Sequence, residues 1–232
     1  MKNILLIGGS YGIGLGIAKE LQYENKVFIA SRTNENLTDL HIKHLPFDAN
    51  TDILDTSKLP DVIDGLVYCP GSINLRPFRG LKPESFESDL QINFINMVKV
   101  IQSVLPNLSA SNQSSIILFS SVAASMGMPF HTSVAAAKGA IEGFAKALAA
   151  EYAPKIRVNV IAPSLTDTPL ADKFLNNDVK REKSAERHPL KRVGTSEDMA
   201  QMASFLLSEK SSWISGQIFH VDGGMSTLLT NQ

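Results

Sequence analysis

The chain has 232 residues, of which 44% are hydrophobic and 19% are charged. This composition supports a sizeable buried core and excludes disorder as the main state. Lys and Arg number 22 against 23 Asp and Glu, which gives a formal net charge of -1. Such a balance predicts no electrostatic attraction to nucleic acid or to an anionic membrane. We therefore expect a small-molecule ligand and protein partners.

Cysteine content and the N-terminal segment bear on location. Cys69 is the single cysteine, so no internal disulfide can form, and the sequence has no Cys/His cluster at zinc-ligand spacing. No metal site is predicted. The apolar stretch behind Lys2 runs into Gly8 after a few residues, too short for a signal peptide or a membrane span. A reducing, cytoplasmic location is the expectation.

Short apolar runs alternate along the chain with longer amphipathic segments, a pattern typical of strand–helix units around a parallel sheet. The predicted strands cover residues 3–7, 27–30, 42–47, 65–68, 115–119, 157–161 and 217–221. The predicted helices cover residues 14–22, 83–105, 135–152, 169–183 and 196–207. Because the longest strands are apolar on both faces, helices must cover both sides of the sheet. The sequence thus predicts one doubly wound α/β domain over residues 1–232, with a seven-stranded, mostly parallel sheet.

Two local features refine this prediction. Ser196, followed by Glu197 and Asp198, is typical of a capped helix start with acidic residues at the positive end of the helix dipole. The polar segment 34–59 is too short and too polar for a full crossover helix, and we expect only a turn or two there. No repeat, low-complexity tract or linker divides the chain.

A glycine-rich turn follows the first predicted strand. Gly8, Gly12 and Gly14 are separated by three residues and then by one, and a helical pattern begins directly afterwards. Glycine lets the backbone turn tightly and approach a pyrophosphate, whose charge is favoured by free N–H groups and the helix dipole. The pattern predicts a nucleotide site. An ordinary strand-to-helix turn without a ligand is the alternative.

The segment from Gly8 to Gly14 resembles the opening of the short-chain dehydrogenase/reductase family, whose pattern is Thr-Gly-x-x-x-Gly-x-Gly. All three glycines match, and Ile7 stands in place of the Thr. The resemblance covers almost the whole chain, up to the segment Val221-Asp222-Gly223-Gly224. It implies a Rossmann-type fold that binds a nicotinamide dinucleotide. The residues it assigns to the first turn of that site are Gly8, Ser10, Tyr11, Gly12, Ile13 and Gly14.

The end of the second strand bears on which dinucleotide is bound. Ala30-Ser31-Arg32 contains no carboxylate that could accept both hydroxyls of the adenosine ribose. Arg32 offers a fixed fork of donors that suits a 2′-phosphate, so NADP(H) is predicted over NAD(H). An exposed arginine without a ligand is the alternative. By resemblance, Ser31 belongs to the same site and Asp48 contacts the adenine amino group, although a turn-forming Asp48 fits the sequence too.

The resemblance also assigns residues to the nicotinamide end of the cofactor. Thr168 is expected to bond the carboxamide, while Ser164 replaces a family glycine and Cys69 replaces a family asparagine. We interpret Cys69 as a packed thiol and not as a nucleophile. The full set assigned to this end is Gly71, Lys138, Pro163, Thr166 and Thr168.

The family's catalytic residues are Asn, Ser, Tyr and Lys, and three of them are matched here by Asn93, Ser121 and Lys138. In the family, Tyr protonates a carbonyl as hydride arrives, and the neighbouring Lys charge makes that Tyr a useful acid. The Tyr position falls thirteen residues after Ser121 and four before Lys138, where this chain has Val134. Valine carries no transferable proton. Losing a general acid typically lowers the rate by about 10² to 10⁴, whereas positioning of the substrate can survive.

Three substitutes for the missing hydroxyl are considered. His131 lies seven residues before Lys138, where enoyl-reductase relatives place their Tyr, and histidine titrates close to neutral pH. Ser133 and a water held by Lys138 and Ser121 are the others. A His131 that is only a polar loop residue is the alternative. The resemblance further implies a mobile lid over residues 169–189, and we interpret its charges at positions 180–183 as a solvated face.

Three functions are compatible with these residues. The first is an NADP(H)-dependent oxidoreductase that reduces a carbonyl or oxidises an alcohol with an atypical proton donor. The second is a catalytically silent NADP(H)-binding partner or sensor, and the third is enoyl-thioester reduction that uses His131. Small residues after position 134, together with the resemblance, imply a homodimer or homotetramer. Tight packing of that helix on its own sheet is the alternative.

Overall fold

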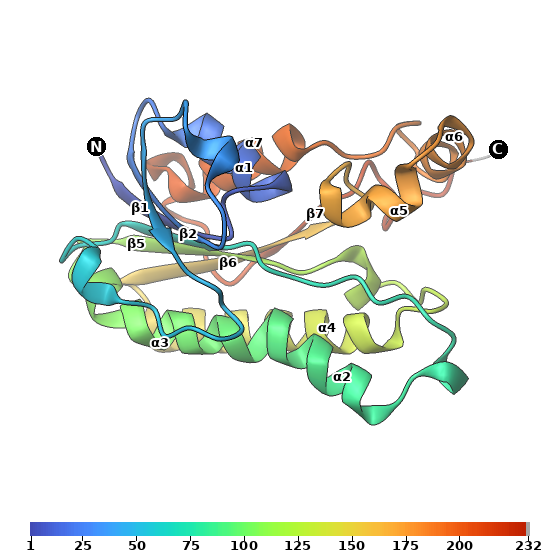
Figure 1. Ribbon diagram of the computed structural model, residues 1–232, viewed down its shortest axis with the longest axis horizontal. Helices are drawn as coiled ribbons and strands as arrows, with labels where there is room; N and C mark the ends of the chain where they lie inside the picture. Colours follow the sequence, from blue (N-terminus) through green and yellow to red (C-terminus); the bar gives the residue numbers. More distant parts are fainter. Residues whose placement is uncertain (231–232) are drawn as a thin grey trace.

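The computed structural model describes residues 1–230, and its seven strands form one sheet in the order β3-β2-β1-β4-β5-β6-β7 (Figure 1). All six strand pairs are parallel. The strands are β1 Asn3–Ile7, β2 Lys26–Ser31, β3 Ile42–Pro46, β4 Gly65–Tyr68, β5 Ser114–Phe119, β6 Ile156–Pro163 and β7 Ile218–Val221. The prediction of a single, doubly wound α/β domain is confirmed.

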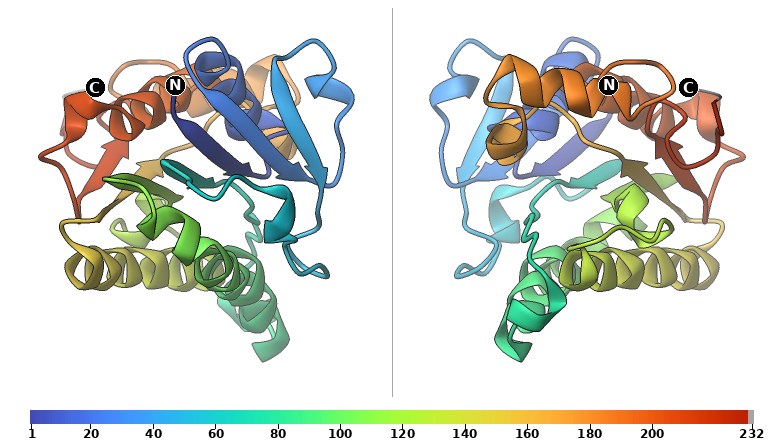
Figure 2. Two further views of the ribbon diagram at one scale, coloured as in Figure 1. Left: turned by 90° about the vertical axis from the view of Figure 1, so that its left-hand side faces the viewer. Right: turned by 90° about the vertical axis from the view of Figure 1, so that its right-hand side faces the viewer.

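Helices cover both faces of the sheet, as two-sided apolar strands require (Figure 2). The helices α1 Gly12–Leu21 and α7 Ser196–Leu207 pack on one face. On the other face lie α3 Asn96–Ser109 and α4 Thr132–Tyr152, with α2 Pro83–Leu90 against α4. The strand side chains alternate between the two cores, so that Leu5 points to one and Leu6 to the other. Both cores are continuous and apolar.

The topology fixes where a ligand can bind. The chain runs outward from β1 through β2 to β3 and then returns to place β4 on the other side of β1. In doubly wound sheets, this reversal opens a crevice at the carboxyl ends of the two central strands. Gly8 directly follows β1, and Gly71 follows β4 after a short turn. The fold therefore brings both predicted glycine turns to one edge of the sheet.

The helix predicted over residues 83–105 is continuous but contains a π-helical turn, Gln91–Ile95, between α2 and α3, and it extends to Ser109. Asn93 lies inside this turn, and its side-chain Nδ2 donates a hydrogen bond to the Asp89 carbonyl oxygen at 2.8 Å. That bond offers the carbonyl an alternative to the regular backbone partner. The irregular turn thus lies at a predicted catalytic residue.

Two other helix predictions need correction. The lid helix predicted over residues 169–183 is divided into a 3₁₀ turn, Pro169–Ala171, a short α5, Asp172–Leu175, and α6, Asp178–Glu186. It breaks because the Asn177 side chain accepts a hydrogen bond from the Lys180 backbone and caps a new helix. The cap of α7 is Thr195 rather than Ser196, and it forms a capping box with Asp198.

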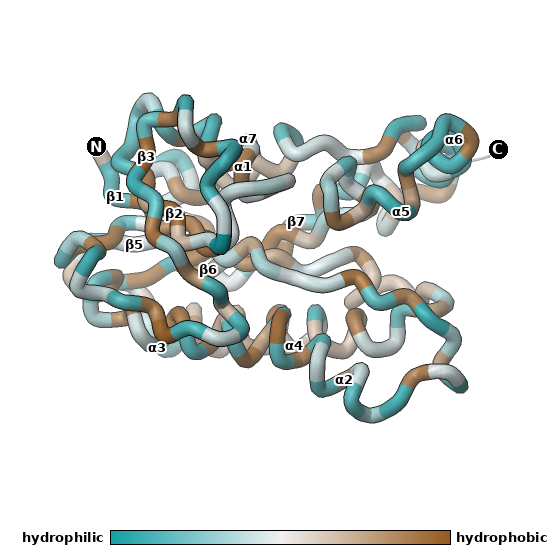
Figure 3. Tube along the Cα trace, viewed as in Figure 1, coloured by the Kyte–Doolittle hydropathy of each residue, from teal (hydrophilic) through white to brown (hydrophobic). Residues whose placement is uncertain are grey.

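Residues 34–59 contain two 3₁₀ turns, Glu35–Leu37 and Thr56–Lys58, in agreement with the expectation of a turn or two. No helix within residues 1–230 is long and apolar enough to cross a bilayer. Hydropathy along the trace separates the lid from the rest: most of α6 is hydrophilic, whereas α4 alternates between apolar and polar positions (Figure 3).

Candidate active site

The glycine turn after β1 has a geometry that other residues would disturb. Gly8 and Gly12 have positive φ angles of 78° and 51°, the left-handed region that glycine tolerates best. At Gly14, an added Cβ atom would lie 2.4 Å from the Gly8 carbonyl oxygen. The next residues begin α1, whose N-cap Tyr11 makes no side-chain capping bond. The first backbone N–H groups of α1 are therefore left without a side-chain acceptor, and an anionic phosphate suits them.

The residues predicted for the adenosine end lie on the adjoining loops. The Ser31 Oγ donates to the Thr33 carbonyl oxygen at 2.8 Å, and the Ser10 Oγ lies 3.2 Å from the Thr33 Oγ1. Both hydroxyls therefore shape the loop after β2. Arg32 is exposed, and its guanidinium has no hydrogen-bond or ion-pair partner within the described residues 1–230. That leaves all its donors available for a phosphate.

Asp48, predicted to contact adenine, has a local structural role. Its Oδ1 accepts a hydrogen bond from the Asn50 backbone N–H at 2.9 Å, which is the geometry of an Asx turn. The turn-forming interpretation of this residue is therefore the one the structure supports. The contact with adenine stays a prediction.

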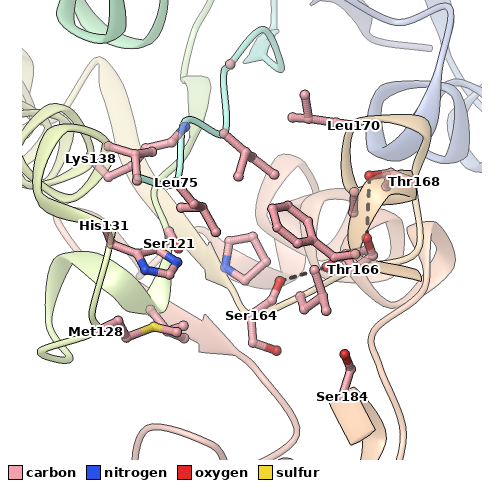
Figure 4. A pocket seen from close by; sticks show the side chains of 18 of the residues that line it. Leu75, Ser121, Met128, His131, Lys138, Ser164, Thr166, Thr168, Leu170 and Ser184 are labelled. Atoms are coloured by element: carbon pink, nitrogen blue, oxygen red, sulfur yellow. Dashed lines mark hydrogen bonds between the residues drawn. The ribbon is translucent and has the colours of Figure 1, made fainter. Parts of the chain in front are cut away.

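A cavity of about 640 Å³ opens at the carboxyl ends of β4, β5 and β6 and is closed by α4 and the lid (Figure 4). This volume lies in the range of small-molecule sites. The cavity brings together most of the residues predicted for the nicotinamide end and the chemistry, namely Gly71, Ser121, His131, Lys138, Pro163, Thr166 and Thr168, and Ile13 of the glycine turn also lines it. It is connected to the glycine turn, since a Cβ atom on Gly12 would lie 3.2 Å from the Thr168 Cβ.

Lys138 lies on the wall of this cavity, in the second turn of α4. It is buried, and burial lowers its pKa to about 8, while the nearby Asp89 carboxylate acts in the opposite direction. Its Nζ donates a hydrogen bond to the Phe119 carbonyl oxygen at 2.9 Å. A Cβ atom on Gly71 would lie 3.4 Å from this Nζ and 3.1 Å from the Asn93 Oδ1. The predicted residues Lys138, Asn93 and Gly71 are thus packed together.

Asn93 and Asp89 belong to a buried polar cluster behind the cavity wall. The Asn93 Nδ2 donates to the Ser72 Oγ at 2.9 Å, and the Ser72 Oγ donates to the Asp89 Oδ1 at 2.6 Å. Asn74 adds a second donor to the same carboxylate oxygen at 2.7 Å. Sequence analysis missed Asp89, although a carboxylate inside the predicted helix 83–105 was a visible signal. Its negative charge helps to keep the buried Lys138 protonated.

The expected tyrosine position is occupied by Val134, and the two candidate proton donors near it in sequence are His131 and Ser133. Val134 is 5% exposed and lines the cavity, as does His131. The His131 Nδ1 lies 2.7 Å from the Pro129 carbonyl oxygen, so Nδ1 carries the hydrogen and Nε2 is left for other partners. Ser133 is fully buried and does not line the cavity. The suggestion that Ser133 supplies a proton is therefore wrong.

A hydrogen-bonded pair that sequence analysis missed also lines the cavity. The Ser164 Oγ lies 2.8 Å from the His188 Nε2, and the His188 Nδ1 lies 2.7 Å from the Ser184 carbonyl oxygen. Because a carbonyl only accepts, Nδ1 carries the hydrogen and Nε2 accepts the Ser164 hydroxyl proton. His188 is buried. The signal was Ser164 in place of a family glycine, but nothing in the sequence connected it with a histidine 24 residues away.

Cys69 is a neutral thiol at physiological pH. Burial raises the pKa of this thiol to about 12, and the Lys138 charge only partly opposes that shift. Its side chain packs against the core that α1 and α7 cover. This environment agrees with the interpretation of Cys69 as a packed residue and not a nucleophile.

A parallel, doubly wound sheet with a glycine turn at its switch point and a buried lysine on the adjoining cavity defines a Rossmann-type oxidoreductase. A family model described as "Enoyl-(Acyl carrier protein) reductase" matches residues 8–226. The chain is 33% identical over 243 residues to the 3-oxoacyl-[acyl-carrier-protein] reductase FabG of Chlamydia muridarum, covering 97% of each chain. It belongs to the short-chain dehydrogenase/reductase family.

Solved structures agree with this assignment. The aldohexose dehydrogenase of Thermoplasma acidophilum has a TM-score of 0.88 and 25% identity, and the match covers 100% of this chain and 97% of that one. ElxO with NADP bound has a TM-score of 0.88 and 25% identity, with 98% and 99% covered. Among sequence relatives, a tropinone reductase homolog of Arabidopsis thaliana is 30% identical over 242 residues, which cover 97% of this chain and 92% of that one.

Proposed function

We propose that this chain is an NADP(H)-dependent oxidoreductase that reduces a carbonyl or oxidises an alcohol, with a proton donor other than tyrosine. The observation that carries the proposal is Lys138, a buried cation packed beside Asn93 and Gly71 on the wall of the cavity. Burying a charge lowers stability, so a scaffold without a ligand has no physical need for it. NADP(H) is favoured by the unpartnered Arg32 and by the similarity to ElxO, which was solved with NADP.

The residues present fit the dinucleotide. A bound nicotinamide supplies or accepts the hydride. The glycine turn, where a Cβ atom on Gly14 would collide with backbone, leaves room for a diphosphate against the N-terminus of α1. Arg32 would hold the 2′-phosphate, Thr168 the carboxamide and Lys138 the ribose. Ser121 on the cavity wall would hold the substrate oxygen.

For the proton we propose the pair Ser164 and His188. In the reducing direction, the carbonyl carbon gains hydride, and its oxygen takes the Ser164 hydroxyl proton. In this direction His188 starts as the imidazolium, with hydrogens on both Nδ1 and Nε2, and its Nε2 returns a proton to Ser164, which leaves the neutral imidazole with its hydrogen on Nδ1. In the oxidising direction the same atoms move in reverse, and neutral His188 accepts the proton through Ser164. The 2.8 Å bond between these two side chains, both on the cavity wall, supports this relay.

The test is an assay of NADPH oxidation with a panel of ketones, quinones and acyl thioesters. The loss of NADPH absorbance measures the rate. We expect turnover by the wild-type protein and a fall of about 10² to 10⁴ in kcat for Ser164→Gly and for His188→Asn. NADPH affinity should not change in either variant. His131→Ala is the matched control, because it removes the other cavity histidine. Unchanged kcat in both pair variants would contradict the relay.

A second candidate function is favoured by Val134, which offers no proton where the family is expected to have its tyrosine. The protein would then bind NADP(H) without turnover, as a partner or sensor. Its signature is NADPH binding with no oxidation of any panel member, combined with activity that appears in Val134→Tyr. That result would replace the enzymatic proposal.

A third candidate, reduction of an enoyl thioester, is favoured by the description of the matching family model and by His131 on the cavity wall. Figure 4 shows the His131 ring beside Met128 at the cavity. Its signature is NADPH oxidation with an enoyl thioester that His131→Ala abolishes while Ser164→Gly does not.

We also propose a homodimer or homotetramer that pairs α4 across a two-fold axis. Gly139 and Gly143 on this helix have open space where a Cβ atom would be, and Ala136 and Ala147 are exposed. These small residues therefore do not all pack on the protein's own sheet, and they let a second helix approach closely. Sedimentation of the wild-type protein tests this, and a monomer would contradict it.

A further inference from the structure

The charged residues of α6 are sorted by sign around the helix. Lys180 and Lys183, together with Arg187 directly after the last turn, line the cavity. Asp178, Glu182 and Glu186 do not line it: at 3.6 residues per turn, Asp178 and Glu182 fall on the far side of the helix and Glu186 on its flank. A merely solvated helix has no need for this separation, since mixed signs on each face would pair along it.

The cavity has no counter-charge for these cations. Within the described residues 1–230, none of its lining residues is Asp or Glu, and α5 adds a further cation, Lys173. None of the four cations is in an ion pair in that part of the chain. By contrast, Arg181, which lies on the same helix but does not line the cavity, forms an ion pair with Asp167 at 2.6 Å. The positive charge at the lid is therefore uncompensated only on the cavity side.

Two of these cations are already held at the rim by backbone. The Lys173 Nζ donates to the Ile73 carbonyl oxygen, and the Lys180 Nζ donates to the Lys173 carbonyl oxygen, both at 2.9 Å. The side chains of Lys183 and Arg187 have no hydrogen-bond partner within residues 1–230, and both residues are exposed. A guanidinium and an ammonium without partners are well suited to a carboxylate or a phosphate.

Apart from the polar groups assigned to the cofactor and the chemistry, much of the cavity wall is apolar. Leu75, Met128, Val134, Leu170 and Phe174 line it. A molecule that fills this space must therefore have an apolar body, with a polar end that reaches α6.

The cofactor does not account for the cations of α6. Its phosphates are assigned to the glycine turn and to Arg32, whereas α6 lies at the end of the molecule away from α1 and beyond α5 (Figure 1). We propose that the cavity binds an anionic, amphipathic substrate, whose carboxylate or phosphate is held by Lys183 and Arg187 while its apolar body lies beside the nicotinamide. This inference rests on the proposed function for the reaction, but it concerns binding and can be measured without turnover.

Binding is measured by calorimetry on the full chain saturated with NADPH, using matched pairs of probes. Decanoate is compared with decanamide, and acetoacetyl-coenzyme A with the neutral acetoacetyl-N-acetylcysteamine thioester. We expect each anionic probe to bind at least about tenfold more tightly than its neutral partner, and this ratio to shrink as salt is added. The first pair reports a carboxylate and the second a phosphate, so that preference in either pair supports the shared chemistry and identifies its source.

The variants Lys183→Gln and Arg187→Gln, alone and combined, should each lower the affinity for the anionic probe about tenfold and leave the neutral probe unchanged. Arg181→Gln is the matched control, because it removes the same charge from the same helix outside the cavity. Thermal unfolding of each variant shows that it is folded. Equal binding of charged and neutral probes, or an unchanged affinity in the double variant, would overturn the inference. The same probes are titrated into the chain without NADPH. Charge preference there, together with no NADPH binding in a separate titration, would overturn the proposed function alone.

Discussion

The two ends of the cavity are built by different means. At the nucleotide end, the backbone of the glycine turn is the binding element. Room for the diphosphate depends on positions without a Cβ atom, such as Gly14. At the substrate end, side chains from several elements form the walls, among them Val134 of α4, Ser164 after β6 and Arg187 after α6. The backbone site at the nucleotide end tolerates many sequence changes provided that the glycines remain. At the substrate end, a single substitution can alter the chemistry. The comparison explains how a chain can keep a nucleotide site while its catalytic groups change.

The largest effect is expected at the nucleotide end. Gly14→Ala places a methyl group 2.4 Å from the Gly8 carbonyl oxygen, which forces the turn open. NADPH affinity in a direct titration should fall by more than about 100-fold, because the backbone N–H groups no longer point at the diphosphate. Gly80→Ala is the control, since a Cβ atom there meets nothing within 4 Å. If Gly14→Ala binds NADPH normally, the backbone design assigned to this end is wrong.

Lys138 lies between the nucleotide end and the substrate end of the cavity. Its burial predicts how the free energy of unfolding changes with pH. Its pKa is lowered by folding from 10.5 to about 8, so above pH 8 the unfolded chain holds more protons here than the folded one. Stability therefore rises with pH in this window relative to Lys138→Met, by roughly 3 kcal/mol between pH 7 and pH 10.5. Urea unfolding of both proteins at the two pH values measures the difference. A constant difference would show that Lys138 is not desolvated.

The next effect is on the choice of cofactor. Arg32→Ala should lower NADPH affinity about 10- to 100-fold, which corresponds to the loss of charge-assisted bonds to the 2′-phosphate. NADH affinity should stay the same, because NADH lacks that phosphate. Titration of wild type and variant with both nucleotides gives the four affinities. An equal loss of affinity for NADPH and NADH would mean that Arg32 supports the loop and does not bind the 2′-phosphate.

The smallest effect is expected away from both ends. Thr195→Ala removes the capping box of α7, where the Thr195 Oγ1 accepts from the Asp198 backbone N–H at 3.2 Å. The free energy of unfolding should fall by about 1 kcal/mol. The affinity for NADPH and the preference for NADPH over NADH should not change, because the cap contacts neither end of the cavity. A large loss of NADPH binding in this variant would instead connect α7 to the glycine turn that it supports through α1.

The order of strands and helices could be predicted from the sequence because apolar runs and glycine spacing are local signals. Breaks inside helices were harder to predict. The π-helical turn depends on a contact between the Asn93 side chain and the Asp89 carbonyl, and the division of the lid depends on Asn177 acting as a cap. Both are choices between competing hydrogen bonds, which a periodic pattern does not reveal.

The site was predicted unevenly for the same reason. Gly71, Ser121 and Thr168 meet at one cavity because strand ends in a parallel sheet share one edge, and Lys138 reaches the same cavity from α4. The pair of Ser164 with His188 joins two segments that only the folded lid brings together. The sorted charges of α6 were read from sequence as a solvated face, since the sequence does not show which side of the lid faces the cavity.

The central claim is that this chain holds a nicotinamide dinucleotide at the glycine turn and selects the phosphorylated form. Calorimetric titration of the wild-type protein with NADPH and with NADH tests it most directly. The account predicts one NADPH bound per chain, at least about tenfold more tightly than NADH. No measurable binding of either nucleotide would contradict it.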